Sequence, residues 1–193
     1  MRNIGYNSQR DNFSFAGKFP GWAQCMSTCA WMFLSWYRPE VDATDDAGLA
    51  AYVDDVEASV GKPGIGEKIR EKYNWITGRT STWWLVQQAA LQRRIPGNHI
   101  MFHDRFPIEQ LIDIVRIGPV IIGTNKMGGL PGGHIILLCD YDAINYSYLV
   151  NDPYGNALTG YKDPTGQGLP YPVPWLIPYI DYGRNECRVI YTI

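Results

Sequence analysis

The chain has 193 residues, of which 46% are hydrophobic and 19% are charged, and its formal net charge at pH 7 is -2. A small negative charge disfavours nucleic acid as the main partner, because phosphate binding needs a basic patch. No apolar run approaches the length of a membrane span, and the first residues lack the apolar segment of a signal peptide. We therefore expect one domain over residues 1–193, made in the cytoplasm, without a membrane span.

Four cysteines occur in the chain, and without a signal peptide we expect them to be free thiols. They form no Cys-x-x-Cys pair and no cluster with histidine, so the sequence predicts no metal site, and we expect no cofactor. Cys139 and Cys187 fit structural positions in strands. Cys29 lies four residues after Cys25, on the same face of a predicted helix.

The first predicted element is a buried helix that begins near Cys25. A loop with Pro20 and Gly21 precedes this cysteine, and an apolar run follows it until Pro39 stops the helix. A cysteine in the first turn faces unpaired backbone N–H groups and the positive end of the helix dipole, and both favour the nucleophilic thiolate. The alternative is a small buried residue on an apolar helix.

Apolar spacing and capping residues predict further helices along the chain. Thr80 or Ser81 can cap one of them, and Pro107 suits the first turn of another. The expected helices cover 40–59, 67–73, 80–94 and 107–117. Strands are expected at 99–103, 119–123, 134–140, 148–150 and 186–192. The proline-rich stretch before the last strand is predicted to be irregular. Helices first and an antiparallel sheet after them predict an α+β fold.

A histidine and an acid can supply a base and its orienting group for the cysteine. His134 begins one predicted strand and Asp152 ends the next, so the two can lie side by side in an antiparallel pair. Asn151 is the alternative to Asp152, and only one can serve because adjacent strand residues face opposite sides. His99 and His103 are the alternative bases, but neither has a glycine-rich lead-in or a partner strand that ends in an acid.

Four short motifs stand in the order found in a known family: 8–12 (SQRDN), 25–32 (CMSTCAWM), 132–134 (GGH) and 151–155 (NDPYG). With them the chain resembles the papain-like cysteine peptidases related to the double-glycine leader peptidases of bacterial exporters. It is most similar to the free-standing forms in bacteriophage genomes, whose expected substrates are cell-wall peptides. The tail, with Tyr161, Tyr171 and Trp175, is also similar in order.

The resemblance implies a papain-like fold, with N-terminal helices packed on an antiparallel sheet, and a cysteine peptidase. It makes Cys25 the nucleophile, His134 the base, and Asp152 the third catalytic residue. It also implies that the side-chain amide of Gln9 donates to the oxyanion, where a fixed neutral donor is needed. Gln24 remains an alternative donor, although a residue next to the nucleophile usually points away from the carbonyl site.

The glycine-rich loop ahead of His134 is a candidate wall of the substrate cleft. Gly132 and Gly133 would let a substrate backbone approach closely, and the loop could close on it. The alternative is a plain hairpin connection. Trp22 is expected to contribute to a groove lined with aromatic residues.

The function implied by the resemblance is hydrolysis of amide bonds in bacterial cell-wall peptides, by a phage endolysin or a virion-associated lysin. One alternative is an N-acetylmuramoyl-alanine amidase or another thiol acyl-transfer enzyme. The other is a non-catalytic phage structural or binding protein with the same fold. We expect a monomer that is made in the host cytoplasm and acts on the cell wall after release or as part of a virion.

Overall fold

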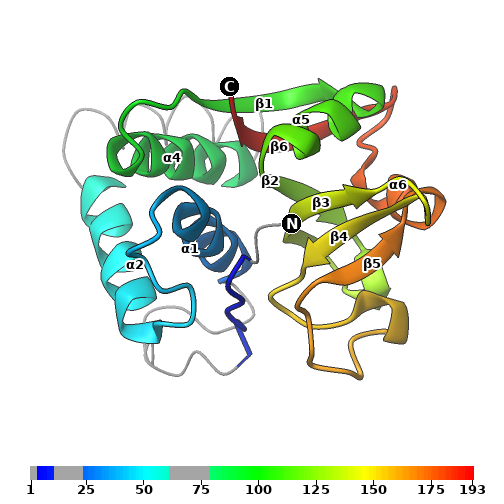
Figure 1. Cartoon of the computed structure of the whole chain (residues 1–193), viewed down its shortest axis with the longest axis horizontal. Helices are drawn as coiled ribbons and strands as arrows, with labels where there is room; N and C mark the ends of the chain where they lie inside the picture. Colours follow the sequence, from blue (N-terminus) through cyan, green and yellow to red (C-terminus); the bar gives the residue numbers. More distant parts are fainter. Residues whose placement is uncertain (1–3, 11–23, 61–78) are drawn as a thin grey trace.

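The computed structural model describes residues 4–10, 24–60 and 79–193, which Figure 1 draws in colour. Helices come first along the chain: α1 (Cys25–Tyr37), α2 (Asp46–Val60) and α4 (Arg79–Arg94). Two more helices accompany the strands, α5 (Leu111–Ile117) and α6 (Val173–Ile180), with short turns η3 (Ile108–Gln110), η4 (Met127–Gly129) and η5 (Ala157–Thr159). The short helix predicted over 67–73 lies outside the described residues. Within the described ranges, no helix is long and apolar enough to cross a membrane.

Six strands form one sheet in which every described pair is antiparallel. They are β1 (Ile100–Pro107), β2 (Val120–Asn125), β3 (Gly133–Asp142), β4 (Ser147–Asn151), β5 (Leu169–Pro172) and β6 (Glu186–Thr192). Their order across the sheet is β1-β6-β2-β3-β4-β5, so the last strand of the chain lies between the first two. The five strands expected from the sequence are confirmed, and β5 was not anticipated.

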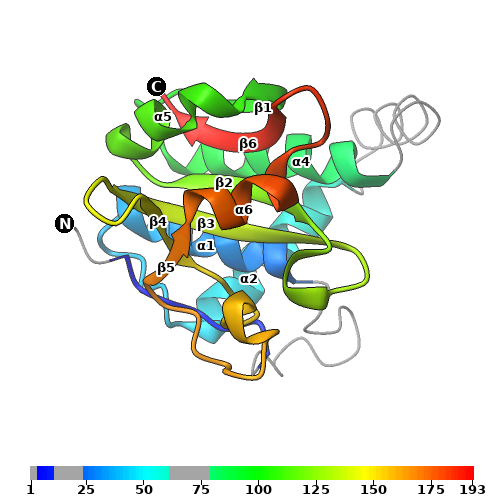
Figure 2. The ribbon, with the colours of Figure 1, turned by 90° about the vertical axis from the view of Figure 1, so that its right-hand side faces the viewer.

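Helices cover both faces of the sheet. Figure 2 shows α6 in front of the sheet, with α1 and α2 behind it. Neighbouring residues of β3 alternate between the two cores, because successive side chains of a strand point to opposite faces. Ile135 packs in the core with α1, α2 and α4, whereas Ile136 packs in the core with α5 and α6. The predicted α+β architecture is confirmed.

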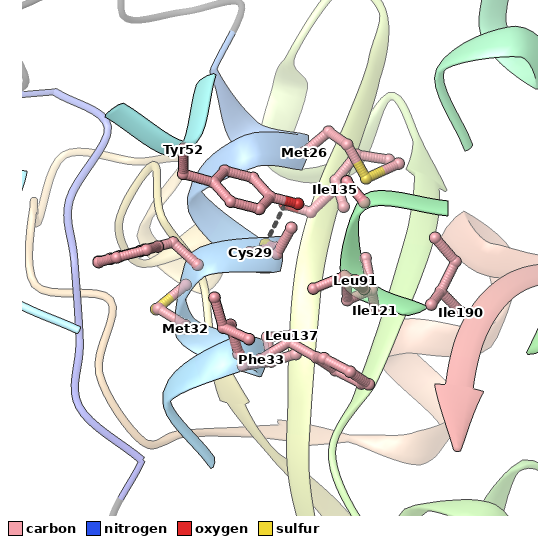
Figure 3. Packing of buried hydrophobic residues seen from close by; sticks show 14 of the residues in the cluster. Met26, Cys29, Met32, Phe33, Tyr52, Leu91, Ile121, Ile135, Leu137 and Ile190 are labelled. Carbon is pink, nitrogen blue, oxygen red and sulfur yellow. Dashed lines mark hydrogen bonds between the residues drawn. The ribbon is translucent and has the colours of Figure 1, made fainter. Parts of the chain in front are cut away.

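Helix α1 is buried along most of its length, and its first residue, Cys25, is partly buried at the edge of the core. Cys29, Met32 and Phe33 are fully buried against the sheet and the neighbouring helices (Figure 3). The helix ends at Tyr37, and the backbone N–H of Arg38 donates to the carbonyl of Leu34 as the cap. The helix predicted to begin near Cys25 is therefore confirmed.

Two predictions from proline positions were wrong. Pro107 is the last residue of β1 and not part of a helix, and α5 begins only at Leu111, after a short 3-10 turn. The proline-rich tail is not irregular throughout, because it contains β5 and α6. Pro174 stands in the first turn of α6, where a helix needs no backbone N–H from it, so this proline starts the helix and does not break it.

Candidate active site

The nucleophile candidate, Cys25, is the first residue of α1, and its side chain is partly exposed. Gln24 is the N-cap residue, and its carbonyl accepts the backbone N–H of Thr28 at 2.9 Å, so the helix ladder starts here. The first turn holds no acidic residue. Backbone N–H groups at this end therefore face the thiol without a competing carboxylate on the helix.

The base candidate, His134, is the second residue of β3 and pairs with Thr124 of β2. Its side chain is 3% exposed, and its Nε2 atom lies 2.7 Å from Oδ1 of Asp152. Burial lowers the pKa of His134, but the charge and hydrogen bond of Asp152, with smaller contributions from Cys25, raise it to about 10. Because Cys25 contributes to this pKa shift, its thiol lies near the imidazole.

The carboxylate of Asp152 is fully buried and is held by donors on both oxygens. Its Oδ1 accepts from His134 and from the backbone N–H of Tyr154 at 3.0 Å. Its Oδ2 accepts from the hydroxyl groups of Tyr171 at 3.0 Å and Tyr161 at 3.3 Å. Four hydrogen bonds therefore offset the hydration that this carboxyl group loses on burial.

Asn151, the alternative third residue, points away from His134. Its side-chain N–H₂ group donates to the carbonyls of Ile4 and Gly5 at 3.5 and 3.4 Å, and its Oδ1 accepts the backbone N–H of Gly168 at 2.9 Å. This side chain therefore ties the amino-terminal segment and the tail to the sheet. The geometry brings Asp152, and not Asn151, to the histidine.

The oxyanion-donor candidate, Gln9, is 1% exposed, and its backbone N–H donates to the carbonyl of Pro153 at 2.9 Å. The hydroxyl of Tyr6 donates to the backbone oxygen of Asp152 at 3.0 Å, so the amino-terminal segment is attached to the turn that carries the acid. Gln24, the alternative donor, is also buried, at the start of α1. Both glutamines thus lie inside the structure, and Gln9 lies on the side of the acid.

The other cysteines lie in less reactive surroundings. Cys29 is fully buried, and its Sγ donates to the carbonyl of Ile135 at 3.5 Å, the dashed line in Figure 3. Burial, followed by the charges of Cys25 and Asp152, raises the pKa of Cys29 well above its ordinary value. Burial also raises the pKa of the Cys139 and Cys187 thiols to about 12 each.

The alternative histidines do not lie on β3. His103 is on β1, at the edge of the sheet, where its ring packs against Phe106 and Tyr191. His99 precedes β1, and its carbonyl accepts the backbone N–H of Ile193 at 3.1 Å. Two strands, β6 and β2, separate β1 from the strand of His134.

The substrate-binding candidates Gly132 and Gly133 are exposed and stand directly before His134. The backbone N–H of Lys126 donates to the carbonyl of Gly132 at 3.0 Å and closes the loop. A Cβ atom added at Gly132 would meet nothing within 4 Å, so space for a side chain exists there. Trp22, the third candidate, lies outside the described residues.

Sequence reasoning missed the tyrosines that hold the acid. Tyr161 and Tyr171 belong to the tail motifs of the resemblance, but no role was derived for them. Arg10 was also missed: its guanidinium donates to the carbonyl of Tyr161 at 3.2 Å and lies 4.7 Å from the ring centre of Tyr154. Among the described residues, no three His, Cys, Asp or Glu side chains gather as a metal ion would require.

Together these elements form a papain-like α+β fold, with Cys25 at the start of a buried helix, His134 on β3 and Asp152 directly after β4. The fold is similar to that of a protein from Bacillus anthracis whose crystal structure is described as that of a C39-like peptidase. The TM-score is 0.56 at 15% sequence identity, over 99% of this chain and 94% of the other. No protein-family model matches the chain, and neither does any curated protein sequence.

Proposed function

We propose that the protein is a cysteine peptidase in which Cys25, His134 and Asp152 form the catalytic triad. The observation that supports this most is the buried hydrogen bond between His134 and Asp152, on an imidazole whose pKa Cys25 also helps to raise. The Nε2 atom is occupied by the acid, so Nδ1 is the ring nitrogen that serves the thiol. An acid that fixes the tautomer and balances the charge of the histidine is what thiol activation needs.

The reaction begins with proton transfer from the Sγ atom of Cys25 to His134. The raised pKa of His134 favours this transfer, because the negative charge of Asp152 stabilises the imidazolium. The thiolate attacks the amide carbonyl carbon, and the carbonyl oxygen becomes an oxyanion. The imidazolium then protonates the amide nitrogen, the C–N bond breaks, and the amine leaves with a thioester remaining on the enzyme.

Water completes the turnover. His134 accepts a proton from water, the oxygen attacks the thioester carbonyl, and the C–S bond breaks. The carboxylic acid leaves, and the proton returns to the sulfur of Cys25. In both halves the backbone N–H of Cys25 and the side-chain amide of Gln9 donate to the oxyanion in our proposal. What supports Gln9 is its burial and the attachment of its backbone to Pro153, next to the acid.

The substrate class we propose is the peptide part of the bacterial cell wall, cut by a phage endolysin or virion-associated lysin. The support for this finer assignment is the sequence resemblance to free-standing phage enzymes. Such a protein would be made in the host cytoplasm and would reach the wall after release or with the virion. It would act as a monomer.

Mass spectrometry of purified peptidoglycan, digested by wild type and by Cys25→Ala, tests the proposal. An endopeptidase releases peptide fragments, whereas an amidase releases whole stem peptides and leaves a new lactyl end on the glycan. New products with wild type alone would support cysteine catalysis, and their masses would separate these two activities. Identical product sets from the two proteins would overturn it and favour the non-catalytic alternative.

A further inference from the structure

We propose that Tyr161 and Tyr171 are positioning residues of the active site. Their hydroxyl groups donate to Oδ2 of Asp152, so that Oδ1 is the oxygen that bonds to His134. This inference rests on the proposed function, because it assigns the tyrosines to the triad. In this proposal neither hydroxyl contacts the substrate or the thiol.

The two hydroxyls approach the same carboxylate oxygen from different parts of the tail. Tyr171 lies on β5, beside β4, and its hydroxyl is 3.0 Å from Oδ2 of Asp152. That hydroxyl also accepts the backbone N–H of Ala157 at 2.9 Å, and its other acceptor, the carbonyl of Gly155, lies further away than the acid, at 3.4 Å. Tyr161 follows η5, and its hydroxyl is 3.3 Å from the same Oδ2 atom. The Oδ2 atom is therefore held by two donors, in addition to the two on Oδ1.

The placement of Tyr161 is built in at a cost to the backbone. Its φ is +62°, a left-handed conformation that a bulky residue rarely adopts. Its ring packs where Gly128 has no side chain, since a Cβ atom there would lie 2.5 Å from Cε2 of Tyr161. Its carbonyl accepts from Arg10 at 3.2 Å. Contacts from Gly128 and Arg10 thus hold Tyr161 in a strained conformation. We take this as support for a role of its hydroxyl at Asp152.

The two hydroxyl groups stabilise the net negative charge that Cys25, His134 and Asp152 carry together. When Cys25 is a thiolate and His134 an imidazolium, the triad carries one net negative charge, next to the buried side chain of Asp152. Hydrogen bonds that donate to an anion stabilise it. Losing one of them should therefore raise the pH at which the thiol of Cys25 gives up its proton. The titratable groups around Asp152 lie on several elements: His134, Cys25, Cys29, Tyr6, Tyr161 and Tyr171. Burial and the charge of Asp152 raise the pKa of both Tyr161 and Tyr171, so both hydroxyls keep their protons and remain donors.

The test is the rate of Cys25 alkylation by iodoacetamide as a function of pH, in wild type, Tyr161→Phe and Tyr171→Phe. Each substitution removes one hydroxyl and keeps the ring. We expect the midpoint of the pH profile to move up by roughly 0.5 to 1 pH unit in each. Tyr148→Phe is the matched control, because Tyr148 is buried in the same core but does not reach Asp152. Its midpoint should equal that of wild type.

Unchanged midpoints in folded Tyr161→Phe and Tyr171→Phe would overturn the inference, as would an equal shift in Tyr148→Phe. If Tyr171→Phe fails to fold, Tyr161→Phe decides alone. Alkylation needs no substrate, so the result stands apart from the proposed function. If the variants shift the alkylation midpoint but the wild-type protein hydrolyses no peptide, the proposed function is wrong and the positioning role stands.

A second pair of variants tests the same placement from the glycine loop. Gly128→Ala would push the ring of Tyr161 aside, whereas Gly129→Ala meets nothing within 4 Å. Both glycines have a left-handed φ, of +60° and +87°, so the backbone strain is comparable. We expect the alkylation midpoint to rise in Gly128→Ala and to stay at the wild-type value in Gly129→Ala. Equal midpoints in the two variants would count against the role of Tyr161.

Discussion

The Nε2 atom of His134 lies 2.7 Å from Oδ1 of Asp152, across two adjacent antiparallel strands, and both side chains are enclosed by protein. Asp152 follows the last residue of β4, Asn151, which bonds to the amino-terminal segment instead. One residue of register therefore decides which side chain meets the histidine.

Cys25→Ala should abolish hydrolysis, by about 10³-fold or more, and leave the fold intact. Alanine is an excellent residue for the first turn of a helix, so circular dichroism and melting temperature should match wild type. Cys29→Ala is the control: it removes a buried sulfur and should cost about 1 to 2 kcal/mol of stability while substantial activity remains. An essential Cys29 beside a dispensable Cys25 would place the site one helical turn further along.

Cys25 should be the first cysteine that iodoacetamide labels at neutral pH. Burial raises the pKa of Cys29 and, to about 12, those of Cys139 and Cys187, so these three carry little thiolate. Peptide mapping by mass spectrometry after short reaction times measures the order. Equal labelling of all four would speak for a binding protein without an activated thiol.

Asp152→Ala should reduce the hydrolysis rate far more than Asn151→Ala, by about 10²-fold or more. An anion stabilises the imidazolium, and its loss also removes the partner of a buried histidine. Asn151→Ala should mainly lower the melting temperature, because it breaks the hydrogen bonds to Gly168 and to the amino-terminal segment. Steady-state rates beside thermal melts separate the two effects, and the reverse ranking of rates would contradict the assignment.

The stability of the protein should fall as the pH rises from about 6.5 towards 10 through the titration of His134. The folded pKa of about 10 lies above the ordinary 6.5, so the folded state holds a proton that the unfolded state releases in this window. The contribution is complete below pH 6.5 and is lost as the pH passes 10. The slope is at most about 1.4 kcal/mol per pH unit. Urea unfolding of wild type and His134→Gln at pH 6 to 9 checks it, and parallel curves would exclude the contribution.

Local patterns were sufficient to predict the elements that carry the proposed triad. The apolar run after Cys25 predicted a buried helix. His134 at the head of one predicted strand and Asp152 at the end of the next predicted a histidine beside an acid. The position of β6 between β1 and β2 could not be predicted, because strand order depends on packing between distant segments. The tyrosines on Asp152 were missed for the same reason: Tyr171 lies 19 residues from the acid and reaches it through β5. The prolines misled the prediction, because Pro174 suits the first turn of a helix and α6 also contains Pro178 in its interior.

Replacing Gly132 and Gly133 by alanine should reduce turnover more than it reduces stability. Both residues are exposed just before His134, neither has a left-handed φ, and an added Cβ meets nothing closer than 3.5 Å. The stability change should therefore stay within about 1 kcal/mol. If the loop forms a wall of the substrate cleft, two methyl groups there obstruct the approach of a substrate backbone and the rate falls. Gly129→Ala provides the contrast, because its φ of +87° makes alanine costly and should lower the melting temperature. Melting temperatures measured beside hydrolysis rates decide the role: an unchanged rate, or a rate that falls only in step with stability, would reduce the loop to a connection between β2 and β3.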